Sequence, residues 1–241
     1  MNQPLDGRVV LVTGANGGLG EPFVLQALEQ GATTVYAAAR TPKEWSDPRI
    51  RPLALDITDA DSIARAVAEA ADVDLLVNNA GIAPAGDSIA GPEDELRRIF
   101  ETNFFGTLRL SNAFSPVLAA NGGGNILNVL SLSAWVPVPT GYAASKAALW
   151  SATNALRVTL RAQGTGVTGL LVGMVDTAMS TRWDVPKVSP ASVVEQAYAG
   201  IASGALEVLA DDDTRGVKAQ LGTPAEQFYP AFDEMMAAFT A

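Results

Sequence analysis

The 241-residue chain contains no cysteine and no histidine. Without cysteine it can form neither a disulfide bond nor a thiolate nucleophile, and it lacks the thiolate ligands of many zinc sites. Without histidine it cannot build a Ser-His-Asp triad or a histidine-ligated metal centre. We therefore expect no metal site, and any acid–base chemistry must use tyrosine, lysine, aspartate or glutamate.

Basic residues are also scarce. There are 16 lysines and arginines against 26 aspartates and glutamates, which gives a formal charge of −10. A surface for nucleic acid or an anionic membrane would carry basic patches, so neither partner is expected. No apolar run reaches the roughly 18 residues that a membrane span needs, and no basic segment followed by an apolar run opens the chain. These observations predict a cytoplasmic protein that acts on a small molecule.

The apolar residues form short strand-like runs that alternate with helical segments. Strands are predicted at residues 8–13, 33–40, 49–55, 74–78, 125–133, 166–172 and 205–210. Helices are predicted at residues 21–30, 59–70, 91–120 and 142–163 and from residue 190, with Thr58 and Ser189 as N-caps and Pro190 at the first helical position. This alternation is typical of an α/β Rossmann-type fold with a doubly wound parallel sheet, here as one domain over residues 1–241. The three aspartates at 211–213 are expected in a solvated turn.

Glycines follow the first predicted strand in the pattern Thr13-Gly14-x-x-x-Gly18-x-Gly20, and a helix follows them. Glycines in this position allow a tight turn and let backbone amides approach a pyrophosphate at the N-terminus of the helix. A plain turn is the alternative for the glycines alone. The strand before them and the helix after them favour a dinucleotide.

The end of the second strand indicates which dinucleotide. In NAD-binding folds an acidic residue stands about 20 residues beyond the glycines, where it binds the ribose 2′-hydroxyl. This chain has Ala39-Arg40 there and no carboxylate. An arginine suits a 2′-phosphate through charge-assisted bidentate hydrogen bonds, although a solvated strand-end arginine is the alternative. We predict NADP(H) as the cofactor.

Tyr142 and Lys146 stand four residues apart at the start of an alanine-rich helix. Residues at this spacing share a helix face. The lysine cation should favour the phenolate and lower the pKa of the tyrosine toward the working pH, where the tyrosine can transfer a proton. Taken alone, the pair is more often part of an amphipathic helix surface.

Together with Asn79-Ala80-Gly81 after the fourth strand, these motifs resemble the short-chain dehydrogenase/reductase family over roughly residues 7–210. The resemblance implies strand order 3-2-1-4-5-6-7, assembly as a homodimer or homotetramer, and the activity of an NADP-preferring carbonyl reductase. It implies a catalytic set of Asn103, Ser131, Tyr142 and Lys146. It also implies NADP contacts from Gly14, Asn16, Gly18, Leu19, Gly20, Arg40, Asp56, Ile57, Asn79, Ala80, Gly81, Tyr142, Lys146, Val175 and Thr177.

In that family the tyrosine protonates the developing alkoxide and the serine orients the carbonyl. The lysine binds the nicotinamide ribose, and the asparagine bends its helix and holds a water that links the lysine to solvent. A satisfied core asparagine is the alternative reading of Asn103. The aspartate and its neighbour at positions 56 and 57 would contact the adenine.

The chain departs from the family pattern in two places. Ser131 precedes Tyr142 by only 11 residues and Ser133 by 9, so the loop between them is shorter than usual. Ser131 is the expected substrate-orienting serine, with Ser133 in reserve. Where the family usually has Pro-Gly, this chain has Val172-Gly173.

An apolar ketone or aldehyde is the expected substrate. A short lid is predicted near residues 176–190. Apolar residues beside the catalytic positions could line the site, although core packing would explain several of them as well; they are Trp135, Val136, Pro137, Val138, Pro139, Met179 and Trp183.

Two other functions fit the same cofactor fold. One is a catalytically idle NADP-binding sensor or scaffold, against which the complete set of catalytic residues argues. The other is a nucleotide-sugar epimerase or dehydratase, which usually has a larger C-terminal substrate region than 241 residues supply.

Overall fold

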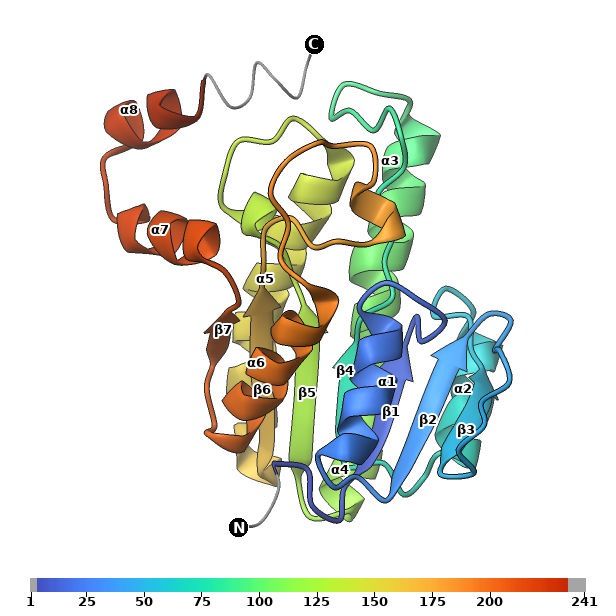
Figure 1. Cartoon of the computed structure of the whole chain (residues 1–241). Helices are drawn as coiled ribbons and strands as arrows, with labels where there is room; N and C mark the ends of the chain where they lie inside the picture. The colour runs from blue at the N-terminus through green and yellow to red at the C-terminus, as the bar shows by residue number, and fades with distance from the viewer. Residues whose placement is uncertain (1–3, 234–241) are drawn as a thin grey trace.

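The computed structural model describes residues 4–233. Seven parallel strands form one sheet in the order β3-β2-β1-β4-β5-β6-β7, which confirms the predicted topology (Figure 1). The strands are short, and the inner strands are largely buried, as expected of a parallel sheet covered on both faces. Three of the five residues of the edge strand β3 are exposed. They are β1 (Val9–Thr13), β2 (Thr34–Ala39), β3 (Ile50–Ala54), β4 (Leu75–Asn78), β5 (Gly124–Val129), β6 (Thr165–Leu171) and β7 (Glu207–Leu209).

Helices cover both faces of the sheet. On one face α1 (Gly20–Glu29) and α6 (Pro190–Ala202) pack against the alternate strand residues Val10, Val12, Val77 and Leu170. On the other face lie α2 (Ala60–Glu69), α4 (Thr107–Ala120) and α5 (Gly141–Leu160). A smaller cluster joins α5 to α7 (Asp212–Gln220) and α8 (Ala225–Phe228) at the side of the sheet where β7 lies (Figure 1).

Strand β1 pairs with both β2 and β4, so the chain moves outward in opposite directions on the two sides of β1. The connections that leave the carboxyl ends of β1 and β4 therefore diverge and open a crevice, which is where α/β sheets bind ligands. The fold thus places the glycine loop and the Asn79-Ala80-Gly81 turn on either side of one opening.

The helix predicted at residues 91–120 is interrupted. It begins at Glu93 as α3 (Glu93–Phe100), passes through a π-helical segment (Glu101–Gly106), and continues as α4. Pro92 precedes the first helical residue and Gly106 closes the wide turn, where a Cβ would lie 2.9 Å from the Ile57 carbonyl oxygen. The π segment contains Asn103, at the position where the resemblance implies a bend in the helix.

Two predictions about helix caps had different outcomes. Ser189 accepts a hydrogen bond from the Ser192 amide and Pro190 opens α6, as predicted. The predicted cap at Thr58 is wrong, because the Asp59 side chain accepts the Asp61 amide and α2 begins one residue later.

The strand predicted at residues 125–133 ends at Val129. Ser131 is the N-cap of a single 3₁₀ turn, Leu132–Ala134, and its side chain accepts the Ser133 amide. A turn, and not strand alternation, therefore determines how the two serines lie relative to each other.

The expectation of a solvated turn at residues 211–213 is wrong for its first member. Asp211 is buried and is the N-cap of α7, whereas Asp212 and Asp213 are exposed. Over residues 4–233, no helix combines the length and the apolar character needed to cross a membrane.

Candidate active site

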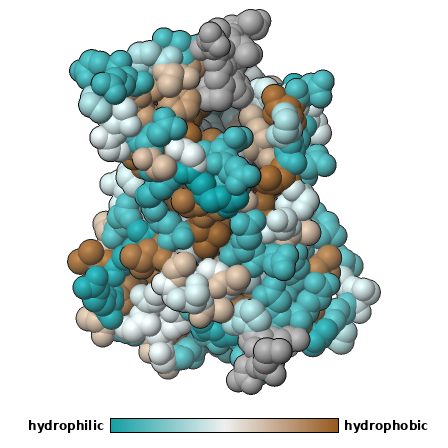
Figure 2. Space-filling model, turned by 60° about the vertical axis from the view of Figure 1, so that its left-hand side comes forward, coloured by the Kyte–Doolittle hydropathy of each residue, from teal (hydrophilic) through white to brown (hydrophobic). Residues whose placement is uncertain are grey.

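A cleft of about 1060 Å³ lies beyond the carboxyl ends of the strands. Apolar side chains gather across the middle of the face drawn in Figure 2, between hydrophilic groups. The cleft brings together predicted residues from four connections of the sheet: Gly14, Gly18, Leu19, Asn79, Ala80, Gly81, Ser131, Ser133, Tyr142, Lys146, Val175, Thr177, Met179 and Trp183. Eight other predicted residues are not on its wall: Asn16, Gly20, Arg40, Asp56, Ile57, Asn103, Trp135 and Pro137.

The glycine loop lies at one end of the cleft. Gly14 and Gly18 have φ angles of +66° and +58°, in the left-handed region that glycine adopts without strain. A Cβ at Gly20 would lie 2.0 Å from the Gly14 carbonyl oxygen, so only glycine lets α1 begin so close to the loop. The side-chain nitrogen of Asn79 donates to the carbonyl oxygen of Thr13, at 2.8 Å, and so fixes the loop to the turn after β4. This arrangement provides the cradle that a pyrophosphate needs.

Arg40 and Asn16 lie at the nucleotide end of the loop, outside the cleft wall. Arg40 is exposed at the end of β2. Asn16 donates to the Thr41 carbonyl oxygen at 2.8 Å and accepts the Lys43 amide at 3.2 Å, which ties the glycine loop to the segment after β2. These bonds hold the backbone that follows Arg40 next to the glycine loop.

Asp56 and Ile57 follow β3. One carboxylate oxygen of Asp56 accepts the amide of Thr58 at 2.9 Å and its hydroxyl at 2.7 Å. These bonds, the amide first, lower the pKa of Asp56, and the charge of Arg40 adds to the effect. Ile57 is buried in the core against Gly106, so an adenine ring could touch only its edge.

Tyr142, Ser131 and Lys146 converge at the other end of the cleft. Tyr142 lies on the first turn of α5 and forms a hydrogen bond with Ser131. The Ser131 oxygen also accepts the Ser133 hydroxyl at 2.9 Å and the Ser133 amide at 3.1 Å. The Lys146 ammonium lies 5.6 Å from the centre of the Tyr142 ring. Ser131 thus faces the tyrosine, and Ser133 supports Ser131.

Burial changes the pKa of both titratable groups. It lowers the pKa of Lys146 from 10.5 to about 8, because a charged ammonium loses its hydration in a buried site. It also raises the pKa of Tyr142, and the hydrogen bond with Ser131 lowers it by less. The predicted lowering of the Tyr142 pKa by Lys146 is therefore wrong for this structure. Desolvation outweighs the hydrogen bond, and the lysine directs one N–H to the Val129 carbonyl oxygen at 2.7 Å.

The first turn of α5 is held by groups that the sequence motifs did not identify. The two carboxylate oxygens of Asp87 accept the amides of Gly141 and Tyr142 at 2.9 and 2.8 Å. Thr140 is the N-cap and accepts the Ala143 amide at 3.1 Å. A Cβ at Gly141 would lie 2.6 Å from a methyl carbon of Leu96, so α5 packs closely against α3 here. Thr140 has a cap signature in the sequence, whereas Asp87 lies 55 residues before Tyr142 with no motif to mark it.

Asn103 is fully buried, and its side chain has its hydrogen bonds satisfied. Its oxygen accepts the Ile82 amide at 2.8 Å, and its nitrogen donates to the Ile82 carbonyl at 2.9 Å and to the Ser145 hydroxyl at 3.0 Å. The side chain therefore joins the turn after β4 to the residue before Lys146. The Asn103 side chain therefore matches the alternative of a core asparagine whose hydrogen bonds are satisfied. Its role in a proton relay remains a prediction.

The apolar residues predicted to meet a substrate divide into two groups. Val136, Val138, Pro139, Met179 and Trp183 line the cleft. Trp135 does not; it is buried against Trp150, with ring centres 5.8 Å apart, and the ammonium of Lys218 lies 4.8 Å from its ring centre. Pro137 is exposed and also lies outside the wall. The short loop turns these two residues away from the cleft.

Comparison with known proteins agrees with this geometry. A sequence model described as short chain dehydrogenase matches residues 8–187. A short chain dehydrogenase from Burkholderia cenocepacia, crystallised in complex with NADP, is 36% identical with a TM-score of 0.86, and the match covers 92% of this chain and 96% of that one.

Curated relatives are more distant. A sorbitol dehydrogenase of Cereibacter sphaeroides is 34% identical over 195 residues, which are 75% of this chain and 74% of that protein. A probable oxidoreductase, EphD, of Mycobacterium bovis is 33% identical over 184 residues. The match spans 70% of this chain and only 31% of that longer protein. The family match covers well over half of the sequence and includes every strand from β1 to β6. The chain therefore belongs to the short-chain dehydrogenase family of oxidoreductases.

Proposed function

We propose that the protein is an NADPH-dependent reductase that reversibly converts a ketone or aldehyde into an alcohol. The observation that carries the proposal is the meeting of Tyr142, Ser131 and Lys146 with the glycine loop in one cleft. When bound, NADPH supplies the hydride. The protein must then bind the carbonyl compound, orient it, stabilise the developing alkoxide and provide a proton.

Tyr142 is the proposed proton donor. Because burial raises its pKa, the phenol keeps its proton at neutral pH and can give it to the carbonyl oxygen during reduction. Ser131 lies within hydrogen-bonding reach of the phenol. Since the Ser131 oxygen already accepts two bonds from Ser133, its own proton is left to donate toward Tyr142 or a substrate oxygen.

Lys146 and the glycine loop are the proposed cofactor-binding groups. A protonated lysine has three N–H donors, and Val129 takes one, so two remain for ribose hydroxyls. The positive φ angles of Gly14 and Gly18 fit a pyrophosphate, and the exposed guanidinium of Arg40 fits a 2′-phosphate. The NADP complex of the Burkholderia relative supports this choice of cofactor.

Assembly as a homodimer or homotetramer is also proposed. Phe105 and Val158 are exposed large apolar side chains on the π segment and on α5, with 46% and 70% of their surface accessible. Apolar groups of this size on neighbouring helices favour burial against a second copy.

The test is NADPH oxidation against a panel of aliphatic and aromatic ketones and aldehydes, with NADH in parallel. Turnover with at least one simple carbonyl compound, faster with NADPH, is expected. Tight NADPH binding without turnover across the panel would instead support an idle sensor. Activity confined to nucleotide sugars would support an epimerase or dehydratase.

A further inference from the structure

The segment that follows β6 crosses the cleft without the proline that the family pattern usually places there. Val172, Gly173, Met174, Val175 and Thr177 all line the cleft. A proline ring would fix the φ angle of its residue, and valine does not. Other contacts must hold this backbone in place.

Backbone hydrogen bonds supply part of that support. The Val172 carbonyl accepts the Leu132 amide at 2.9 Å, and the Met174 carbonyl accepts the Val188 amide at 2.9 Å. Between these two points lies Gly173, which lacks a side chain. Its amide donates to a carboxylate oxygen of Asp211 at 2.7 Å, a charge-assisted bond to a residue 38 positions away.

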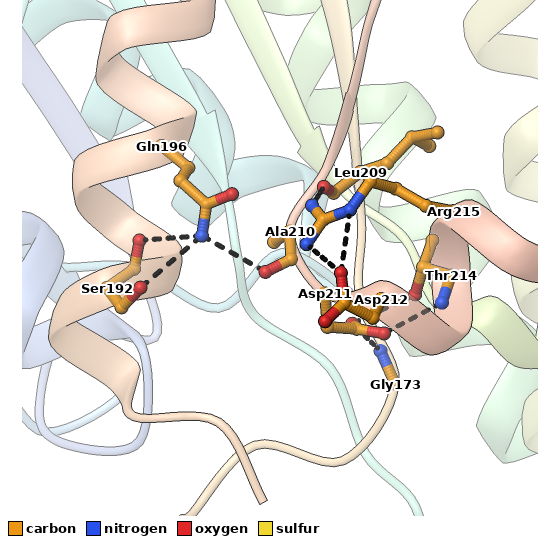
Figure 3. Close-up of polar contacts among 9 residues, drawn as sticks. All are labelled: Gly173, Ser192, Gln196, Leu209, Ala210, Asp211, Asp212, Thr214 and Arg215. Carbon is orange, nitrogen blue, oxygen red and sulfur yellow. Dashed lines mark hydrogen bonds and ion pairs between the residues drawn. The ribbon is translucent and has the colours of Figure 1, made fainter.

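The same carboxylate caps α7. Its second oxygen accepts the Thr214 amide at 2.7 Å, and the oxygen that binds Gly173 also accepts the Thr214 hydroxyl at 2.9 Å (Figure 3). Asp211 is 8% exposed. One buried carboxylate therefore joins the segment after β6 to the helix whose first turn brings Asp213 to the cleft wall.

The chain just before Asp211 is fixed from both sides, as Figure 3 shows. The Ala210 carbonyl accepts the Gln196 side chain from α6 at 3.0 Å, and the Leu209 carbonyl accepts the Arg215 guanidinium at 2.6 Å. Arg215 also binds Asp212, so its charge is directed away from Asp211. The carboxylate of Asp211 is thus held in place and bound by N–H and O–H donors.

We propose that Asp211 is a positioning residue for the reaction end of the cleft. Its carboxylate holds the Gly173 amide, and through it the segment that is expected to face the nicotinamide; this role rests on the proposed function. Without the bond, the segment would be less ordered in the free protein. The free energy of cofactor binding would then have to offset the entropy lost when the segment becomes ordered, and the cofactor would bind more weakly. Contacts at the adenosine end, around Asn16 and Arg40, would not change.

The test uses Asp211→Ser. Serine is a good N-cap, but its hydroxyl is too short to serve both the Thr214 amide and the Gly173 amide. Asp211→Gly is the second variant in case the first does not fold. Glycine is tolerated at an N-cap and has no side chain that could accept the Gly173 amide. Asp59→Ser is the matched control, because Asp59 caps α2 with a bond to Asp61 and does not line the cleft.

Two measurements follow. Hydrogen exchange of the protein alone should be about tenfold faster at residues 172–177 in the Asp211 variants. The Kd for NADPH should rise about tenfold, and kcat should fall, while the Kd for adenosine 2′,5′-bisphosphate, which has no nicotinamide, should not change. Asp59→Ser should leave all of these values as in the wild type.

Unchanged exchange at residues 172–177 would overturn the proposal and leave Asp211 as a helix cap only. Equal weakening of NADPH and the adenosine fragment would overturn it too, since the effect would then not be local to the nicotinamide. Wild-type protein that binds no NADPH would contradict the proposed function itself. The exchange measurement, made without cofactor, would still show whether Asp211 holds the segment.

Discussion

The two ends of the cleft are built differently. At the nucleotide end, the Arg40 and Asn16 side chains are exposed, and Asn16 binds only backbone groups of the segment after β2. At the reaction end, Ser131 and Lys146 are buried, and their neighbours are held by side chains from distant segments. The difference teaches that the exposed Arg40 side chain can be altered with little effect on the fold, whereas the reaction end is part of the fold.

The largest effect is expected for Tyr142→Phe at the reaction end. Loss of the phenolic proton donor should lower kcat by about 10²- to 10⁴-fold. NADPH binding should stay close to the wild-type value, because the nucleotide end is unchanged. Steady-state kinetics and fluorescence titration with NADPH measure the two quantities. A variant that stays active would remove Tyr142 from the mechanism.

Arg40→Asp tests the nucleotide end. A charge-assisted hydrogen bond to the 2′-phosphate is worth about 1.5–3 kcal/mol, so the preference for NADPH over NADH should fall by about 10- to 100-fold. The melting temperature should hardly change, since Arg40 is exposed. The measurement is the ratio of kcat/KM for NADPH to kcat/KM for NADH. Arg49→Asp, a substitution at another exposed arginine, is the control. An unchanged ratio would contradict the assignment of NADP(H).

The buried lysine predicts a pH dependence of stability. In the unfolded chain Lys146 keeps its proton up to its ordinary pKa of 10.5, whereas in the folded protein it loses the proton near pH 8. Between these values the unfolded state binds more protons, so the free energy of unfolding rises with pH, by about 3 kcal/mol in all. Denaturant unfolding at pH 7 to about 9.5, below the range where tyrosines ionise, should show the rise in the wild type and its absence in Lys146→Met. Equal slopes for the two proteins would contradict the lowered pKa.

The smallest expected effect separates two tryptophans of the substrate region. Trp183 lines the cleft and Trp135 does not. Trp183→Ala should raise KM for an apolar ketone by about 5- to 10-fold. Trp135→Phe should leave KM unchanged and lower stability by about 1 kcal/mol through looser packing on Trp150. If KM changed more in the Trp135 variant than in the Trp183 variant, the substrate would have to bind on the Trp135 side of the loop.

Much of the fold could be predicted from the sequence because its signals are local. Buried strands, glycine turns and a Ser189-Pro190 helix start all lie within a few residues, and the strand order and cap at Ser189 are confirmed. The π-helical segment could not be predicted. It adds one residue to a helix, and this leaves the helix propensities and the apolar spacing of the sequence unchanged. The last residue of this segment, Gly106, packs against Ile57, a contact between segments far apart in the sequence.

The site shows the same division. Tyr142, Lys146, Gly14 and Gly18 lie on the cleft wall, as their motifs predicted. The supports could not be predicted, because Asp87 and Asp211 act on amides 54 and 38 residues away, and a single carboxylate in a loop carries no sign of its partner. The pKa of Tyr142 was predicted in the wrong direction because its burial, which dominates, is a property of the folded chain.

The close packing at Gly141 has a consequence for laboratory evolution of the enzyme. A side chain there would first meet a methyl group of Leu96 and the Asp87 carboxylate that binds the turn carrying Tyr142. Libraries that vary this position therefore test the repacking of Leu96 together with substrate choice. Met179 and Val185, which line the cleft and are 44% and 42% exposed, carry no such constraint. New substrate ranges should therefore be sought by diversifying those two positions, with the residue before the tyrosine kept as glycine.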